Sequence, residues 1–150
     1  MRVVLQRVKE ASVTIEGVVK SEIKEGLLIL VGIENEDTAD DIQWLASKIA
    51  QIRIFSDEAG LMNRSVMDIQ GEMLVVSQFT LHASTKKGNR PSFLKAARPD
   101  IAIPMYENFV SKLNELSRLN VLTGEFGADM KVALLNDGPV TIIIDSKNRE

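Results

Sequence analysis

The wholly apolar stretch LLILV, Leu27 to Val31, decides the fold class of this 150-residue chain. A continuous apolar run of this length, bounded by turn residues, is typical of a strand that is covered on both faces. The next segment, residues 38–41, has the sequence Thr-Ala-Asp-Asp and fits a helix capping box with Asp41 in the acidic position. Apolar residues then recur at helical spacing, at Ile42, Leu45, Ile49 and Ile52. The pattern predicts a buried strand followed by an amphipathic helix over residues 38–52.

Further strands are expected on both sides of this unit. Alternating or apolar runs between turn residues predict strands at residues 3–8, 12–15, 18–23, 27–33, 53–55, 73–81, 121–122, 131–135 and 140–144. Proline is favoured at the first position of a helix, so Pro104 predicts the start of a second helix over about 104–119. We therefore expect a single α+β domain over residues 1–150, with a strand-rich, mostly antiparallel sheet or barrel-like core and two main helices.

Composition excludes several classes of protein and site. Hydrophobic residues make up 45% and charged residues 26%, as in ordinary soluble domains. No apolar run approaches the ~20 residues of a membrane span, and the N-terminal residues lack the pattern of a signal peptide. We expect a cytoplasmic protein that does not bind membranes. The chain has no cysteine and one histidine, His82, so a cysteine-based zinc site and a multi-histidine metal site are excluded.

The distribution of charge is more informative than the net charge of −3, which argues against a general DNA- or RNA-coating protein. Between Met73 and Pro99 there is no acidic residue, whereas five are basic: Lys86, Lys87, Arg90, Lys95 and Arg98. Such a local basic segment is suited to docking one phosphate-rich end of a nucleic acid. A solvated lysine-rich loop is the alternative interpretation.

The segment before this basic stretch, Ser77 to His82, contains the only arrangement that resembles a nucleophile and a base. In an extended strand Gln78, Thr80 and His82 would share one face. Thr80 and His82 would then lie roughly 6.5 Å apart, which is too far for a direct hydrogen bond. No acidic residue nearby in the sequence orients the imidazole, so a strand threonine and a surface histidine are the preferred interpretation.

The segment Asn136-Asp137-Gly138-Pro139 joins two apolar runs near the end of the chain. Proline donates no hydrogen bond to a sheet and is confined to edges, strand starts and bulges. Two interpretations are open: a plain turn between strands, or a backbone feature that contacts a ligand.

Five segments together resemble one known family, D-aminoacyl-tRNA deacylase. They occur in the family's order along essentially the whole chain: Gln6-Arg7-Val8, Ala11-Ser12-Val13, Ser77-Gln78-Phe79-Thr80-Leu81, Gly88-Asn89-Arg90-Pro91-Ser92-Phe93 and Asn136-Asp137-Gly138-Pro139-Val140-Thr141. The resemblance implies a homodimeric hydrolase that cleaves the ester between a D-amino acid and the 3′ end of tRNA. It implies a reaction that needs no metal ion and no cofactor.

The resemblance also assigns roles to residues. Ser77, Gln78, Phe79 and Thr80 would line the pocket of one subunit, with the N–H groups of Phe79 and Thr80 stabilising the oxyanion and the terminal 2′-hydroxyl of tRNA helping to activate water. Gly138 and Pro139, joined by a cis bond, would reach in from the other subunit, bind the α-amino group through carbonyl oxygens and leave no room for an L side chain. Lys86, Lys87 and Arg90 are the candidate tRNA contacts.

Two other functions are considered beside this one. An editing enzyme for L-aminoacyl or glycyl esters would have a similar site, although the intact Gly-Pro signature argues against L specificity, and glycyl-tRNA is an expected side substrate. A non-catalytic module that binds tRNA ends would need only the basic segment.

Overall fold

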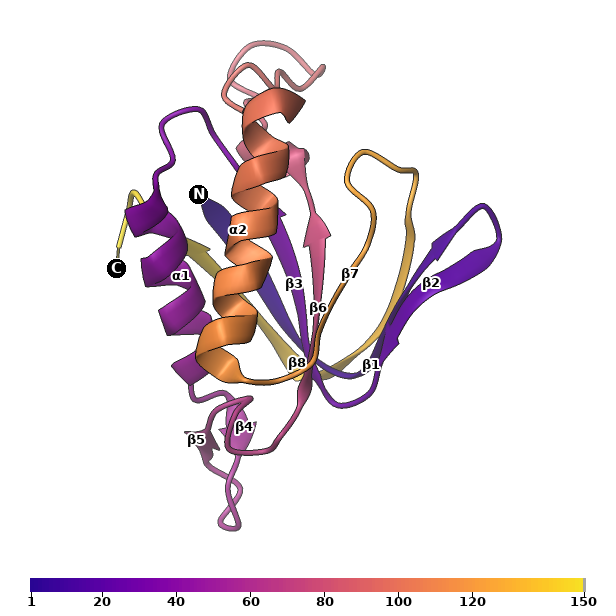
Figure 1. Cartoon of the computed structure of the whole chain (residues 1–150), viewed down its shortest axis with the longest axis vertical. Coiled ribbons are helices and arrows are strands. Elements are labelled where there is room, and N and C mark those ends of the chain that lie inside the picture. Colours follow the sequence, from indigo (N-terminus) through magenta and orange to yellow (C-terminus); the bar gives the residue numbers. More distant parts are fainter. Residues whose placement is uncertain (150) are drawn as a thin grey trace.

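The computed structural model describes residues 1–149, which form a curved sheet with helices on one face (Figure 1). In chain order the elements are β1 (Arg2–Ile15), β2 (Val18–Ile23), β3 (Gly26–Gly32), α1 (Ala39–Gln51), β4 (Phe55–Ser56), β5 (Met62–Arg64), β6 (Glu72–Ser77), the 3-10 helix η1 (Phe79–His82), α2 (Pro99–Ser117), β7 (Val121–Thr123) and β8 (Lys131–Asp145). Helices α1 and α2 lie side by side against the sheet in Figure 1, which confirms the predicted α+β class with two main helices.

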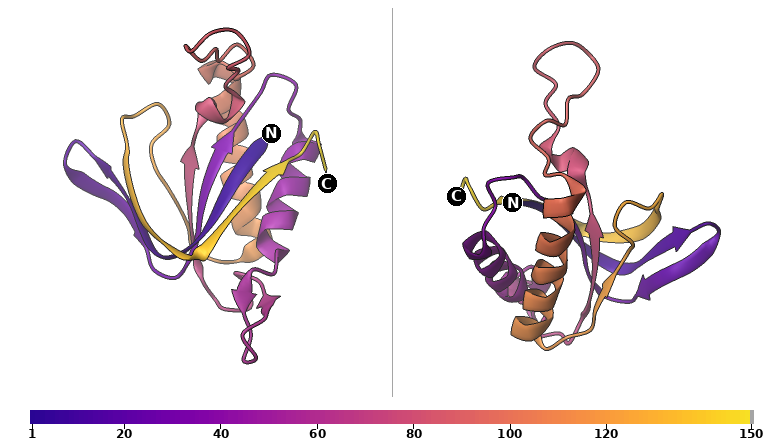
Figure 2. Two further views of the ribbon diagram at one scale, coloured as in Figure 1. Left: turned by 180° about the vertical axis from the view of Figure 1, so that it is seen from behind. Right: turned by 45° about the horizontal axis from the view of Figure 1, so that its top comes forward.

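The main sheet has the strand order β2-β1-β3-β6-β7, and β8 also pairs with β1. The three pairs made by β1 are antiparallel, whereas β3–β6 and β6–β7 are parallel. The sheet is therefore mixed but mostly antiparallel, and it curves toward a barrel-like shape (Figure 2). The separate strands predicted at residues 3–8 and 12–15 are one continuous strand, because β1 pairs with β8 along most of its length.

Strand β3 is covered on both faces, as its apolar sequence predicts. Leu27, Ile29 and Val31 belong to the main apolar cluster, which includes residues of α1 and α2. Leu28 belongs to a second cluster on the other face of the sheet, together with residues of β1 and β6. The middle of the sheet is thus a rigid support for the segments that follow β3 and β6.

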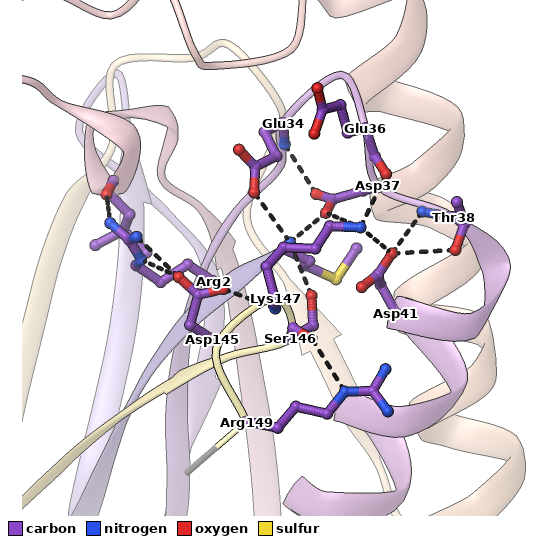
Figure 3. Close-up of polar contacts among 12 residues, drawn as sticks. Arg2, Glu34, Glu36, Asp37, Thr38, Asp41, Asp145, Ser146, Lys147 and Arg149 are labelled. Carbon is purple, nitrogen blue, oxygen red and sulfur yellow. Dashed lines mark hydrogen bonds and ion pairs between the residues drawn. The ribbon is translucent and has the colours of Figure 1, made fainter.

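The predicted capping box at the start of α1 is present. The Asp41 carboxylate accepts hydrogen bonds from the backbone N–H and the hydroxyl of Thr38, at 2.8 and 3.1 Å. It also accepts one from the Lys147 ammonium at 2.8 Å (Figure 3). Burial of Asp41 would by itself raise the pKa of its carboxyl group, but the hydrogen bonds from Lys147, Ser146 and Thr38 outweigh burial and hold the pKa below its usual range. The start of α1 is therefore tied to the end of β8.

A second polar contact ties the end of β8 to η1. The Arg2 guanidinium donates two hydrogen bonds to the Asp145 carboxylate, at 3.0 and 2.8 Å (Figure 3). Its remaining terminal nitrogen donates to the Leu81 carbonyl at 2.8 Å. The last residues of β8 and the first of β1 thus hold the C-terminal half of η1 in place.

Helix α2 begins earlier than the sequence predicts. Pro99 occupies its first position, and Pro104 lies inside the helix rather than at its start. Only Pro99 satisfies the preference of proline for the first helical position. The apolar stripe of the helix begins at Ala102, before Pro104, and Ala102 packs in the core with Tyr106 and Phe109. Among residues 1–149, no helix is both long enough and apolar enough to cross a membrane.

Candidate active site

Strand β6 ends at Ser77, and the chain then turns into η1, so the predicted strand over residues 73–81 is too long. The neighbouring strand β3 ends at the same level, because Val31 pairs with Ser77. A Cβ at Gly32 would come within 3.0 Å of the Gln78 carbonyl, the Leu81 Cβ and the His82 ring. Glycine at position 32 therefore lets η1 pack directly on the end of β3.

The turn changes the surroundings of Thr80 and His82. The Gln78 side-chain amide donates to the Thr80 hydroxyl at 2.5 Å. His82 is not the expected surface residue, since only 3% of it is exposed, and its Nε2 has no hydrogen-bond partner among the described residues. The threonine hydroxyl is thus bonded to an amide, while the only histidine is packed against Gly32.

A pocket of about 320 Å³ opens where β3 and β6 end. Of the predicted site residues, Ser77, Gln78 and Phe79 line it, and Thr80 is exposed next to it. The opposite wall is the loop between β7 and β8, which the sequence analysis did not identify: Phe126, Gly127, Ala128, Asp129 and Met130. Apolar spacing gives no signal for such a loop, because its role depends on where β7 and β8 place it.

Helix α2 supports the strand that carries Ser77. The Tyr106 hydroxyl donates to the Val75 carbonyl at 2.8 Å, and burial raises the pKa of this tyrosine. The Tyr106 ring also contacts Phe126 edge to face, with centroids 5.9 Å apart. One buried side chain therefore contacts both β6 and the loop that forms the opposite wall of the pocket.

The Gly138-Pro139 pair lies inside β8 and not in a turn between two strands. Gln6 pairs with Thr141 and Val8 pairs with Asn136, so four residues of β8 lie opposite Arg7 alone. This is an irregular bulge, one of the few sheet positions that tolerate proline. The peptide bond between Gly138 and Pro139 is cis, as the resemblance implies, and both residues are exposed.

Two side chains hold this bulge, and neither was singled out from the sequence as a site residue. Arg7 donates to the Asp137 carbonyl at 2.9 Å and to the Ile54 carbonyl at 2.5 Å. Asn136 accepts a hydrogen bond from the Val140 N–H at 2.8 Å and donates to the Val140 carbonyl at 3.3 Å. Both lie in segments that carry the family resemblance, Gln6-Arg7-Val8 and the segment that begins at Asn136, and this resemblance was the available signal.

Within one chain the bulge and the pocket lie at opposite ends of β3. Arg7, which holds the bulge, pairs with Leu27, whereas Ser77 of the pocket pairs with Val31. Four residues of strand separate these levels, which is roughly 13 Å along the sheet. Figure 2 likewise shows β8 bending at the end of the sheet away from the loop that follows η1. Neither Gly138 nor Pro139 is among the residues that line the pocket.

The basic segment forms a projecting loop closed by a bridge between Ser84 and Ser92, with backbone hydrogen bonds of 2.8 and 2.9 Å. Lys86, Lys87 and Arg90 are all exposed on it. The loop begins directly after η1, so its charges are close in sequence to the pocket (Figure 1). A search of residues 1–149 finds no group of three His, Cys, Asp or Glu side chains placed to hold a metal ion.

Comparison with known proteins gives one consistent result. The model of the family described as D-Tyr-tRNA(Tyr) deacylase matches residues 4–145. The D-aminoacyl-tRNA deacylase of Flavobacterium johnsoniae is 65% identical over 150 residues, and that of Parabacteroides distasonis is 66% identical over 150 residues. Both alignments cover 100% of this chain and 100% of the relative.

Two solved structures share the fold of this chain. A structure titled c-Myc DNA Unwinding Element Binding Protein is 42% identical, with a TM-score of 0.91, and the alignment covers 97% of this chain and 98% of the other. A structure titled as that of a probable eukaryotic D-amino acid tRNA deacylase superposes with a TM-score of 0.81 over 95% of this chain and 97% of the other. The second is only 16% identical and bears on the fold alone.

Proposed function

The chain belongs to the D-Tyr-tRNA(Tyr) deacylase family, and from this we propose that it hydrolyses the ester joining a D-amino acid to the 3′ end of tRNA. As a member of this family it is an enzyme, a D-aminoacyl-tRNA deacylase. We assign this reaction to the pocket where β6 ends, because Ser77, Gln78 and Phe79 line it. The proposed function is tested by measuring release of free D-tyrosine from charged tRNA with catalytic amounts of protein. A module that only binds tRNA ends would release none.

The reaction proposed for this pocket uses backbone groups. Phe79 and Thr80 are the first two residues of η1, so their N–H groups have no acceptor within the turn. Directed at the ester carbonyl, each would stabilise the tetrahedral oxyanion by a few kcal/mol. Water adds to the carbonyl carbon, the bond to the ribose 3′-oxygen breaks, and that oxygen takes up a proton. We assign the activation of water to the neighbouring 2′-hydroxyl of the substrate.

Selection of the D-amino acid is proposed to lie with the bulge in β8. Gly138 and Pro139 are exposed, and the neighbouring Asp137 carbonyl is held by Arg7. Arg7 thus holds the backbone beside Gly138 and Pro139, whose own carbonyl oxygens are proposed to bind the substrate α-amino group. In the same arrangement, closely packed backbone would exclude an L side chain. Glycine has no side chain to exclude, so glycyl-tRNA is proposed as a second substrate, whereas L-aminoacyl esters are not.

The two halves of this site are proposed to meet only in a homodimer. Within one chain they lie at opposite ends of β3, as the pairing of Leu27 with Arg7 and of Val31 with Ser77 indicates. Two apolar side chains near the bulge, Leu134 and Leu135, are exposed on β8. We propose that a two-fold dimer covers them and places the bulge of one subunit at the pocket of the other. Two-fold pairing is the commonest form of homo-oligomer.

Replacing Thr80 with alanine is expected to leave substantial activity. The hydroxyl of Thr80 accepts one hydrogen bond from Gln78, and loss of such a bond costs about 1 kcal/mol, less than a tenfold change in rate. Steady-state hydrolysis of D-tyrosyl-tRNA measures the effect. Near-complete loss of activity, together with a covalent acyl adduct on the wild-type Thr80 detected by mass spectrometry, would instead identify this residue as a nucleophile.

Replacing Lys86, Lys87 and Arg90 together with alanine is expected to weaken tRNA binding and flatten its dependence on salt. Each lost phosphate contact lowers the slope of log K against log salt concentration by about 0.7 to 0.9. Titration of binding at several salt concentrations measures the slope, and hydrolysis at saturating tRNA is expected to change less. Lys20→Ala is the control, because Lys20 is exposed on β2 outside this loop. An unchanged affinity and slope would leave the loop as a solvated surface.

A further inference from the structure

Two aromatic side chains at the mouth of the pocket are exposed to solvent. Phe79 is 55% exposed and Phe93 is 36% exposed. Their rings pack edge to face, with centroids 5.0 Å apart and an angle of 75° between the planes. Phenylalanine is normally buried, and an exposed aromatic pair marks a candidate binding surface.

The charges around this pair limit what it binds. Phe93 directly follows the Ser84–Ser92 bridge that closes the basic loop. All five charged residues between Met73 and Pro99 are basic. Exposed aromatic rings beside a basic backbone-binding surface are the combination that binds single-stranded nucleic acid, because the rings stack on bases and the cations pair with phosphates. A purely apolar partner would gain nothing from the charges.

We propose that the Phe79–Phe93 pair is a stacking surface for the unpaired bases of tRNA next to the aminoacylated nucleotide. This inference rests on the proposed function, because it requires the ester to occupy the pocket that Phe79 lines. With the ester in place, the terminal ribose lies at the pocket mouth. The next bases then pass over the two rings, and their phosphates point toward the cations of the loop.

Phe93→Ala tests the inference without altering the backbone of η1. Base stacking on an aromatic side chain is worth ~1–3 kcal/mol, so KM for D-tyrosyl-tRNA is expected to rise about tenfold or more, with kcat little changed. Hydrolysis of the D-tyrosyl ester of adenosine, which carries no further base, is expected to change much less. The salt dependence of tRNA binding should keep its slope, unlike that of the Lys86, Lys87 and Arg90 variant.

Two further variants serve as controls. Phe93→Tyr keeps the ring and is expected to restore KM. Leu94→Ala removes a neighbouring apolar side chain that is 91% exposed and is expected to leave KM unchanged. If Phe93→Ala raises KM equally for both substrates, or for neither, the proposal that the two rings stack on tRNA bases is wrong. Dissociation of a Phe93→Ala dimer in sedimentation would also overturn it, by showing that a second copy covers the rings. If the wild-type protein hydrolyses neither substrate, the proposed function itself is wrong, and with it the stacking surface that depends on it.

Discussion

Replacing Gly138 with alanine is expected to lower the rate of D-aminoacyl-tRNA hydrolysis by about a hundredfold, because displacing a site group by about 1 Å has an effect of this size. Gly138 has a φ of +139°, a conformation that residues with a Cβ rarely adopt. The added Cβ would lie 2.8 Å from a Val140 methyl carbon and 3.0 Å from the Arg7 guanidinium. Relief of these contacts must move the bulge, and with it the carbonyl oxygens proposed to bind the substrate.

The matched control is Gly60→Ala. Gly60 also has a positive φ, of +80°, but a Cβ there would meet no atom within 4 Å. It lies between β4 and β5 and does not line the pocket. Both variants should lose some thermal stability, whereas only Gly138→Ala should lose activity. A folded Gly138→Ala dimer with the wild-type rate and wild-type rejection of L-tyrosyl-tRNA would contradict the role proposed for the bulge.

Replacing Leu135 with lysine is expected to produce an inactive monomer. Leu135 is 56% exposed on β8, three residues before Gly138. If a dimer interface covers it, two-fold symmetry places a lysine from each subunit there, and burying an unpaired charge costs several kcal/mol. Sedimentation at assay concentrations should show a dimer for the wild type and a monomer for the variant. Leu61→Lys, at an exposed leucine of the β4–β5 hairpin, is the control.

Mixing two inactive variants separates a shared site from a general need for dimerisation. Ala128→Trp places a large side chain in the wall of the pocket, and Gly138→Ala alters the bulge. A mixed dimer contains one site in which both halves are wild type, so exchange of subunits should restore part of the activity. A fully active monomer, or no recovery after demonstrated exchange, would contradict the shared site.

The sequence predicts well those elements whose signals are local. The capping box at Thr38 and Asp41 and the apolar stripe after it define α1 to within a residue at each end. The apolar run in β3 correctly predicts burial on both faces. The start of α2 was wrong because Pro99 and Pro104 give the same signal, and only the packing of Ala102 distinguishes them.

The errors near the site come from partners that are distant in sequence. The chain leaves the strand conformation after Ser77 because η1 packs on Gly32 of another strand. The two apolar runs around Gly138 form one strand because β1, more than a hundred residues earlier, pairs with both of them. His82 is buried because η1, to which it belongs, packs on Gly32. Ser77, Gln78 and Phe79 were identified as site residues by resemblance to a family. The part of the pocket wall formed by residues 126–130 could be identified only from the three-dimensional structure.

The most direct test of the central claim is a comparison of D- and L-tyrosyl-tRNA as substrates for catalytic amounts of the wild-type protein. The claim predicts release of free D-tyrosine over many turnovers, while L-tyrosyl-tRNA decays no faster than without protein. A tRNA-binding module would protect both esters or leave both unchanged. Equal release of D- and L-tyrosine, or no release of D-tyrosine beyond the uncatalysed rate, would contradict the claim.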